Sequence, residues 1–305
     1  MSKLSDILGE VLLPMITPFD SNSKLNLEAT EKLVNYLIEK NYMDSLIVTG
    51  TTGEFYALSF DERIQILRAV KEIVNGRIPI IAGTGSAYTL ETIELTKRAE
   101  EFGYDCVMVV SPYYQKATQE GLYQHFRAVA ESTRLPVMLY NIPLFTGVNI
   151  EAETLARLVR ISNIKAIKEE AGINPIQTTD FRIVAPPDFT IYCGDDTMVL
   201  QTLPQGAVGV VSGGSHVIGD MMKQMIRSYK NGENTMASEL YFKMMPFLKA
   251  LNQNGRVNPI PLLKDAVTIS SGIDVGKPRL PSLGATEAEK SLLKRVLSDI
   301  GRLSE

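Results

Sequence analysis

The 305-residue sequence contains no tryptophan, two cysteines and two histidines. With only His125 and His216, the chain has few side chains for a zinc hydrolase or a histidine proton relay. Cys106 and Cys193 lie in apolar, strand-like segments without metal-ligand spacing, so we expect no metal site and a reducing compartment, the cytoplasm. Proton transfer must therefore depend on tyrosine, lysine, carboxylate, hydroxyl or water.

Long apolar runs and basic clusters are also missing. No segment reaches the roughly 18 apolar residues of a membrane-spanning helix, and the first ten residues do not resemble a secretory signal. The formal net charge is −4. These features argue against a membrane or a nucleic acid as a partner, and they favour a small-molecule substrate.

Short β-branched runs alternate with longer amphipathic ones over the first 230 residues. The pattern predicts strands at 11–17, 45–48, 78–82, 106–110, 136–140, 164–168, 190–193 and 208–211. It predicts helices at 28–40, 61–74, 89–102, 119–132 and 151–160, and a helical stretch after each of the last two strands. Because no Gly-, Ser- or Pro-rich linker interrupts the series, we expect an α/β protein with one (β/α)8 TIM barrel.

The strands stop near residue 230. Beyond it, amphipathic runs predict helices at 235–251, 261–271 and 285–300. We therefore expect a catalytic barrel over residues 1–230 and a C-terminal helical domain over 231–305. This appendage would close a subunit interface or one face of the barrel.

Lys168 stands at the carboxyl end of the predicted sixth strand. In a TIM barrel, that end of the strands and the loops after them build the active site. Burial among apolar residues disfavours an ammonium ion, so we expect a lowered pKa and a neutral amine that attacks a ketone to form a Schiff base. The alternative is a lysine whose charged end simply reaches solvent.

Other strand ends carry hydroxyl groups. After the second strand, Gly50 allows a tight turn, and Thr51 and Thr52 offer hydroxyl and main-chain N–H groups that suit a small carboxylate. Tyr114 follows the fourth strand and Tyr140 ends the fifth. We expect the hydroxyl groups of Thr51, Tyr114 and Tyr140 to meet Lys168 and to relay protons without histidine.

Several acidic residues and His216 receive a structural interpretation. Asp195 and Asp196 follow the seventh strand and are expected to cap the next helix rather than bind Mg²⁺. His216 is expected near a helix start. Glu169 and Glu170 are adjacent on a strand and point to opposite faces, so they are not a glycosidase pair.

The motifs GTTGE, SPYY, YNIP, IKEEAG and GDD, in this order, resemble the dihydrodipicolinate synthase / N-acetylneuraminate lyase family of pyruvate-dependent class I aldolases. The resemblance runs from Leu13 into the C-terminal helices, where the segment 258–261 (NPIP) looks like the synthase branch. It implies a TIM barrel that forms a homo-oligomer, a tetramer or dimer, and needs no metal or organic cofactor. The implied ligands are pyruvate and a small aldehyde or 2-oxo acid.

The resemblance also implies roles for single residues. Lys168 matches the Schiff-base lysine, and Tyr140 matches the tyrosine that relays protons and positions the carbonyl. Thr51 and Tyr114 match the other members of the proton relay. Tyr113 matches a tyrosine that reaches into the neighbouring subunit.

Three further positions match family contacts to the substrate. Thr52 matches the residue that holds the pyruvate carboxylate, and the Val211 main chain lies where the family contacts the bound keto acid. Gly194 matches a residue of the substrate channel.

Phe145 departs from the pattern that the resemblance implies. Synthases read Tyr-Asn-x-Pro-x-Arg after the fifth strand, and the arginine holds the carboxylate of aspartate semialdehyde. A phenylalanine in its place forfeits roughly 1.5–3 kcal/mol of charged hydrogen bonding. The sequence therefore favours a 2-keto-3-deoxy sugar acid type of aldolase over 4-hydroxy-tetrahydrodipicolinate synthase. Further alternatives are a keto-deoxy acid dehydratase, a non-catalytic keto-acid sensor, and a phosphosugar enzyme that uses the loop 212–214.

Overall fold

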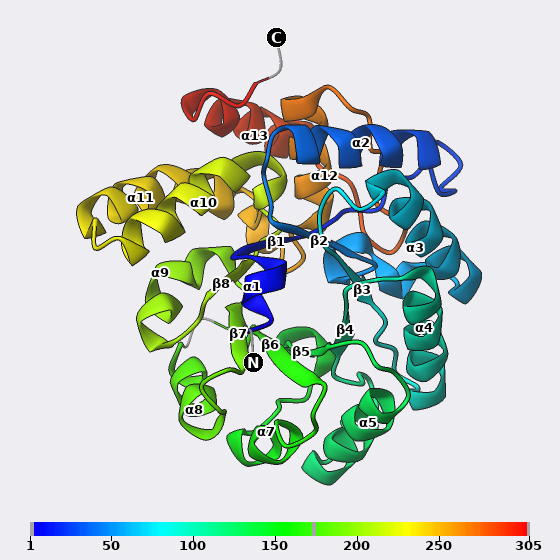
Figure 1. The fold of residues 1–305 in the computed structure, drawn as a ribbon. Helices are drawn as coiled ribbons and strands as arrows, with labels where there is room; N and C mark the ends of the chain where they lie inside the picture. The colour runs from blue at the N-terminus through cyan, green and yellow to red at the C-terminus, as the bar shows by residue number, and fades with distance from the viewer. Residues whose placement is uncertain (1–2, 173–174, 304–305) are drawn as a thin grey trace.

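The chain folds into a closed barrel of eight parallel strands in chain order, ringed by helices (Figure 1). The structure, a computed structural model, describes residues 3–172 and 175–303. The strands are β1 (Val11–Pro14), β2 (Ser45–Val48), β3 (Ile80–Gly83), β4 (Cys106–Val110), β5 (Val137–Asn141), β6 (Ile164–Glu169), β7 (Thr190–Cys193) and β8 (Gly209–Val211). The predicted TIM barrel is confirmed, and β8 pairs with β1 to close it.

The helices follow the predicted alternation. Before and around the barrel they are α1 (Ser5–Leu8), α2 (Leu27–Glu39), α3 (Phe60–Val74), α4 (Thr89–Phe102), α5 (Gln119–Glu131), α6 (Pro143–Thr146), α7 (Ala152–Leu158), α8 (Ile176–Val184) and α9 (Val199–Thr202). At the C-terminal end they are α10 (Ser215–Lys230), α11 (Asn234–Ala250), α12 (Ile260–Ser271) and α13 (Glu287–Asp299). Local capping sets some ends: Ser59 and Glu62 form a capping box at the start of α3.

The first strand is shorter than its predicted range, 11–17. It ends at Pro14 because the chain then leaves the ladder: the Ile16 amide donates to Nε2 of His216, 3.1 Å away. His216 is fully buried near the start of α10, as its helix-start prediction requires. This side chain therefore holds the backbone after β1.

The barrel interior is filled by alternate residues of the strands. Leu12, Met108 and Ala166 belong to one interior cluster, which also contains Leu8 of α1. Helix α1 thus closes the amino end of the barrel, in front of the strands in Figure 1. Lys168 follows Ala166 by two residues, so it continues the inward-facing row at the opposite end.

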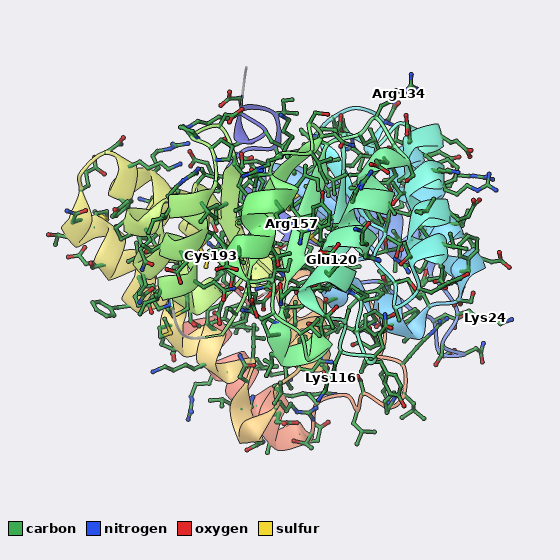
Figure 2. The ribbon with its side chains drawn as sticks, turned by 90° about the horizontal axis from the view of Figure 1, so that it is seen from below. Lys24, Lys116, Glu120, Arg134, Arg157 and Cys193 are labelled. Atoms are coloured by element: carbon green, nitrogen blue, oxygen red, sulfur yellow. The ribbon has the colours of Figure 1, made fainter. Side chains whose placement is uncertain are left out.

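The red C-terminal segments lie at the end of the barrel away from the blue helix α1 in Figure 2, whereas the yellow helices α10 and α11 stand along its side. On the flank between these ends, the figure labels Glu120 of α5 and Arg157 of α7, which form an ion pair at 2.7 Å. Leu248 of α11 and Leu263 of α12 line a cavity at the carboxyl ends of the strands. The appendage therefore covers one face of the barrel, and its division from the barrel at residue 230 stays a prediction.

Across residues 3–172 and 175–303, no helix combines the length and the apolar composition that a bilayer crossing requires.

Candidate active site

Lys168 lies beside Tyr140 at the carboxyl end of the barrel. The parallel register of β5 and β6 pairs the two residues directly. Nζ of Lys168 is 4.0 Å from the centroid of the Tyr140 ring, and both side chains are buried. The two predicted residues are thus brought together by one strand pairing.

Glu170 completes this group and was not among the predicted site residues. Its Oε2 accepts hydrogen bonds from Nζ of Lys168 at 2.8 Å and from the hydroxyl of Tyr140 at 2.9 Å. Glu169 turns the other way and accepts from the side chains of Asn141 and Gln177, so the predicted opposite facing is confirmed. The sequence does contain a signal for Glu170: side chains along a strand alternate with a period of two, which places residues 168 and 170 on one face.

The charge of Lys168 differs from the prediction. Burial by itself lowers the pKa of Lys168, but the nearby carboxylate of Glu170, together with Tyr140, outweighs burial and raises this pKa above its ordinary value. The predicted neutral amine is therefore wrong for the resting site, where Lys168 is an ammonium ion paired with Glu170. The physical reason is a charge that the apolar sequence around Lys168 did not reveal.

Burial also shifts the pKa values of the other two groups, Glu170 and Tyr140. It raises the pKa of the Glu170 carboxyl group, against the opposing effect of Lys168. It raises the pKa of the Tyr140 hydroxyl, and the charge of Glu170 adds to this effect. At neutral pH, Tyr140 is therefore a proton donor.

A cavity of about 200 Å³ opens beside these groups. Most of the predicted substrate contacts line it together with the catalytic candidates: Thr51, Thr52, Tyr140, Phe145, Lys168, Gly194 and Val211. Gly50 does not; it lies behind Thr51 against Met108, where its carbonyl accepts the Gly53 amide and shapes the turn. The structure thus brings the two threonines to the lysine, with Gly50 as their support.

Buried polar contacts hold the loop that carries Thr51 and Thr52. Thr51 and Thr52 lie in a single 3₁₀ turn, Thr51–Gly53, which ends at Glu54 with a φ of 55°. Thr17 donates its hydroxyl to the Gly53 carbonyl at 2.6 Å. The fully buried carboxylate of Glu54 pairs with Lys264 of α12 at 2.9 Å. The C-terminal helices therefore fix the position of the loop as well as covering the cavity.

Gly194 gives Glu170 its room. A Cβ atom on residue 194 would lie 2.6 Å from Cβ and 2.9 Å from Oε2 of Glu170. Real Cβ atoms do not approach so closely, so a side chain here would push Glu170 away from Lys168. Gly194 thus lines the cavity, as predicted, and also permits the Lys168–Glu170 pair.

The two adjacent tyrosines do not lie as predicted. Tyr114 is 95% exposed with a φ of 75°, and it does not line the cavity. Tyr113 packs within its own chain, its ring 6.0 Å from that of Phe55. The prediction that Tyr114 meets Lys168 within one chain is therefore wrong, whereas the reach of Tyr113 into a neighbouring subunit stays a prediction. The positive φ of Tyr114 turns its side chain away from the barrel, which a sequence pattern does not specify.

Phe145 lies on the short helix α6, which begins with Pro143, and it faces the cavity. Among the described residues that line this cavity, Lys168 is the single cation. Three acidic side chains line the same cavity: Glu170, Asp195 and Asp196. The site therefore offers the distal end of a substrate apolar and anionic surface.

Asp195 and Asp196 have structural hydrogen bonds. Asp195 caps a 3₁₀ turn by accepting from the amide and hydroxyl of Thr197, both at 2.7 Å, as the capping prediction requires. Asp196 accepts from the Gly214 amide, at the start of α10, and burial raises its pKa to about 6. In the part of the chain that the structure describes, no three His, Cys, Asp or Glu side chains are grouped to hold a metal ion.

Comparisons with known proteins agree over the whole chain. The sequence model of the dihydrodipicolinate synthetase family matches residues 7–300. The chain is 46% identical to 4-hydroxy-tetrahydrodipicolinate synthase of Desulforudis audaxviator, over 95% of this chain and 97% of the relative. It is 45% identical to the enzyme of that name from Bacillus subtilis, over 96% and 99%.

Solved structures give the same result. A dihydrodipicolinate synthase from Bacillus anthracis has a TM-score of 0.90 and 43% identity, over 98% of this chain and 99% of that one. The enzyme from Cyanidioschyzon merolae, solved with lysine bound, has a TM-score of 0.92 and 38% identity, over 97% and 99%.

The expectation of a sugar acid aldolase is therefore wrong. It gave one position, Phe145, more weight than the rest of the chain, and relatives matched over their full length are named as synthases.

Proposed function

Because the chain belongs to the dihydrodipicolinate synthetase family, we propose that it acts as a 4-hydroxy-tetrahydrodipicolinate synthase, joining pyruvate to aspartate semialdehyde. The enzyme is a class I, pyruvate-dependent carbon–carbon lyase of the aldolase type. One observation carries the proposal: Lys168 is buried at the end of β6, with Nζ beside the Tyr140 ring and at the wall of an open cavity. The lysine supplies the electron sink, so the reaction needs no cofactor.

The proposed steps use the groups that line the cavity. Nζ of Lys168 attacks the ketone of pyruvate and forms an iminium ion. Thr52 and neighbouring main-chain N–H groups hold the pyruvate carboxylate, and the Thr51 hydroxyl belongs to the proton relay with Tyr140. Loss of a proton from the methyl group gives an enamine, which attacks the aldehyde carbon, and the Tyr140 hydroxyl gives or takes the protons.

Aspartate semialdehyde carries an ammonium and a carboxylate at its far end. The carboxylates of Glu170 and Asp195 at the cavity wall suit the ammonium. The cavity offers no second cation among its described lining residues for the carboxylate, because Phe145 occupies the arginine position. We therefore expect weak binding of the semialdehyde and a correspondingly high KM.

The proposed assembly is a homo-oligomer, a dimer or tetramer, in which Tyr114 of one copy completes the site of another. The extreme exposure and positive φ of Tyr114 support this role over an ordinary surface position. A second cavity of about 340 Å³, lined by Thr51, Phe55 and Tyr113, gives a tyrosine ring an apolar place beside the proton relay. The expected location of the assembly is the cytoplasm.

Intact mass measurement after treatment with pyruvate and sodium borohydride tests the chemistry. We expect one reduced pyruvate adduct in the parent protein and none in Lys168→Ala, since the adduct needs the imine nitrogen. Condensation is then measured as pyruvate consumption that depends on aspartate semialdehyde. A parent protein without an adduct would contradict the proposed function.

A further inference from the structure

We infer that Glu170 is a catalytic residue, which takes the proton from the Lys168 ammonium ion and returns it to the departing ketone oxygen. This inference rests on the proposed Schiff-base function. It is carried by geometry: one atom, Oε2 of Glu170, accepts from both the attacking nitrogen and the Tyr140 hydroxyl, at 2.8 and 2.9 Å.

The attacking amine needs a base in the resting site. Lys168 is only 5% exposed and is held as an ammonium ion, whose nitrogen has no free electron pair. Among the described residues, its ion-pair partner is Glu170, already at hydrogen-bond distance. Transfer of one proton along this bond gives a neutral amine and a neutral carboxyl group.

The remaining protons balance without any external group. Nζ adds to the ketone carbon, and one of its two protons moves through the Tyr140 hydroxyl to the former ketone oxygen. The neutral carboxyl group of Glu170 then gives its proton, again through Tyr140, as the carbon–oxygen bond breaks and water leaves. The products are an iminium ion on Lys168, a water molecule and an ionised Glu170, with the same total charge as at the start.

The surroundings of Glu170 favour this cycle. The charged and titratable groups that face it are Lys168 from β6, Tyr140 from β5, and Asp195 and Asp196 after β7. Burial and the nearby Asp195 favour its neutral form, whereas Lys168 favours the ionised one. Its affinity for the proton therefore depends on the charge of the nitrogen beside it, so the proton can move in both directions.

The neighbouring backbone is arranged to keep Glu170 in place. The Glu170 amide donates to the Asn141 carbonyl across the β5–β6 edge. The absence of a side chain at Gly194 leaves the space in which the Glu170 side chain lies. The strands on either side of β6, which are β5 and β7, thus determine where the Glu170 carboxylate points.

The test is the rate of imine formation with pyruvate, followed by borohydride trapping and mass measurement from pH 5 to 10. In the parent, we expect the rate to fall on the acidic side as the Glu170 carboxylate is protonated. In Glu170→Gln, we expect a rate at pH 7 at least about tenfold lower, because a general acid–base contributes about 10²–10⁴-fold. The acidic limb then follows the deprotonation of Lys168 itself, whose pKa burial lowers once the charge of Glu170 is removed.

Two further variants complete the experiment. Glu170→Ala leaves space for a small carboxylate, so added formate should restore part of its rate, which a merely structural role would not allow. Glu169→Gln removes a carboxylate from the same strand end on the opposite face, and it should keep the parental pH profile. Circular dichroism and thermal unfolding compare the folding of all variants.

The outcomes separate the two proposals. A parental rate and pH profile in Glu170→Gln, or no response of Glu170→Ala to formate, would overturn the role of Glu170 while imine formation by the parent still supports the synthase chemistry. A parent that traps no pyruvate would overturn the proposed function and the role of Glu170 with it.

Discussion

The ammonium group of Lys264 lies 2.9 Å from the carboxylate of Glu54, and both side chains are withdrawn from solvent. Lys264 belongs to α12, and Glu54 follows the turn that carries Thr51. Lys264 also donates to the Thr17 carbonyl at 2.9 Å. One buried ion pair therefore joins the C-terminal helices to the loop that faces the catalytic lysine.

Removal of one partner of this pair should be strongly destabilising. We expect Lys264→Met to lower the free energy of unfolding by about 3–5 kcal/mol, because the Glu54 carboxylate remains buried without its cation. The double variant Lys264→Met/Glu54→Gln should lose less than the sum of the single changes. Urea unfolding measures both.

The exposed pair Lys32–Glu28 on α2 is the matched control. Lys32→Met should leave the unfolding midpoint unchanged, since solvent screens this pair. Additive losses in the Lys264 and Glu54 variants would show that the buried pair is not coupled.

An arginine at position 145 should improve use of aspartate semialdehyde. Phe145 faces the cavity from α6 and is 42% exposed, so a longer side chain has room to reach a substrate carboxylate. We expect Phe145→Arg to raise kcat/KM for the semialdehyde by about 10- to 150-fold, from roughly 1.5–3 kcal/mol of charge-assisted hydrogen bonding. The KM for pyruvate should stay unchanged.

Phe145→Lys separates charge from geometry. Its ammonium lacks the planar two-pronged geometry of guanidinium, so we expect a smaller gain than with arginine. Steady-state kinetics with both substrates varied gives these values. Equal kcat/KM in the parent and in Phe145→Arg would mean that the substrate carboxylate binds away from α6.

Tyr114 should act across a subunit boundary. We expect Tyr114→Ala to lose about 10²-fold in kcat, the lower range for a proton relay group. Lys168→Ala should be inactive. After the two variants are dissociated and reassembled together, part of the activity should return, because some sites then combine an intact Lys168 with an intact Tyr114 from another copy.

The control for this complementation is each variant reassembled alone, which should show no gain. Analytical ultracentrifugation of the parent gives the size of the assembly. A parent that sediments as a monomer, or mixtures without regained activity, would contradict a role for Tyr114 in a neighbouring site.

His125 should make stability depend on pH. It is buried in α5, with Nδ1 3.0 Å from the Thr89 hydroxyl, and burial lowers its pKa to about 4. In the unfolded chain its pKa is about 6.5, so below that pH the unfolded state takes up a proton that the folded state does not. Stability is therefore complete above about pH 7 and falls as the pH drops towards 4.

The size of this effect is measured against His125→Leu. From pH 7 to pH 4, the parent should lose about 3 kcal/mol more than the variant, because the variant lacks the proton-binding group. Other titrating groups cancel in the difference between two proteins. Parallel curves of unfolding free energy against pH would show that His125 does not contribute.

The regular elements were accessible from the sequence because their signals are local. The helix Thr89–Phe102 was predicted with its observed ends, since apolar spacing and a following Gly103 are both contained in one short segment. The strand Cys106–Val110 was likewise predicted from its apolar run. The end of β1 was not, because the partner that diverts Ile16 is His216, 200 residues away along the chain.

The sequence by itself determined the barrel, the place of Lys168 at a strand end and its neighbourhood with Tyr140 and Thr51. These follow from strand periodicity and from the rule that parallel strands share a carboxyl edge. Only the tertiary structure decided the charge of Lys168 and the outward direction of Tyr114. A pKa depends on every charge within a few ångströms, here above all Glu170, and a side-chain direction depends on one backbone angle, neither of which a pattern along the chain contains.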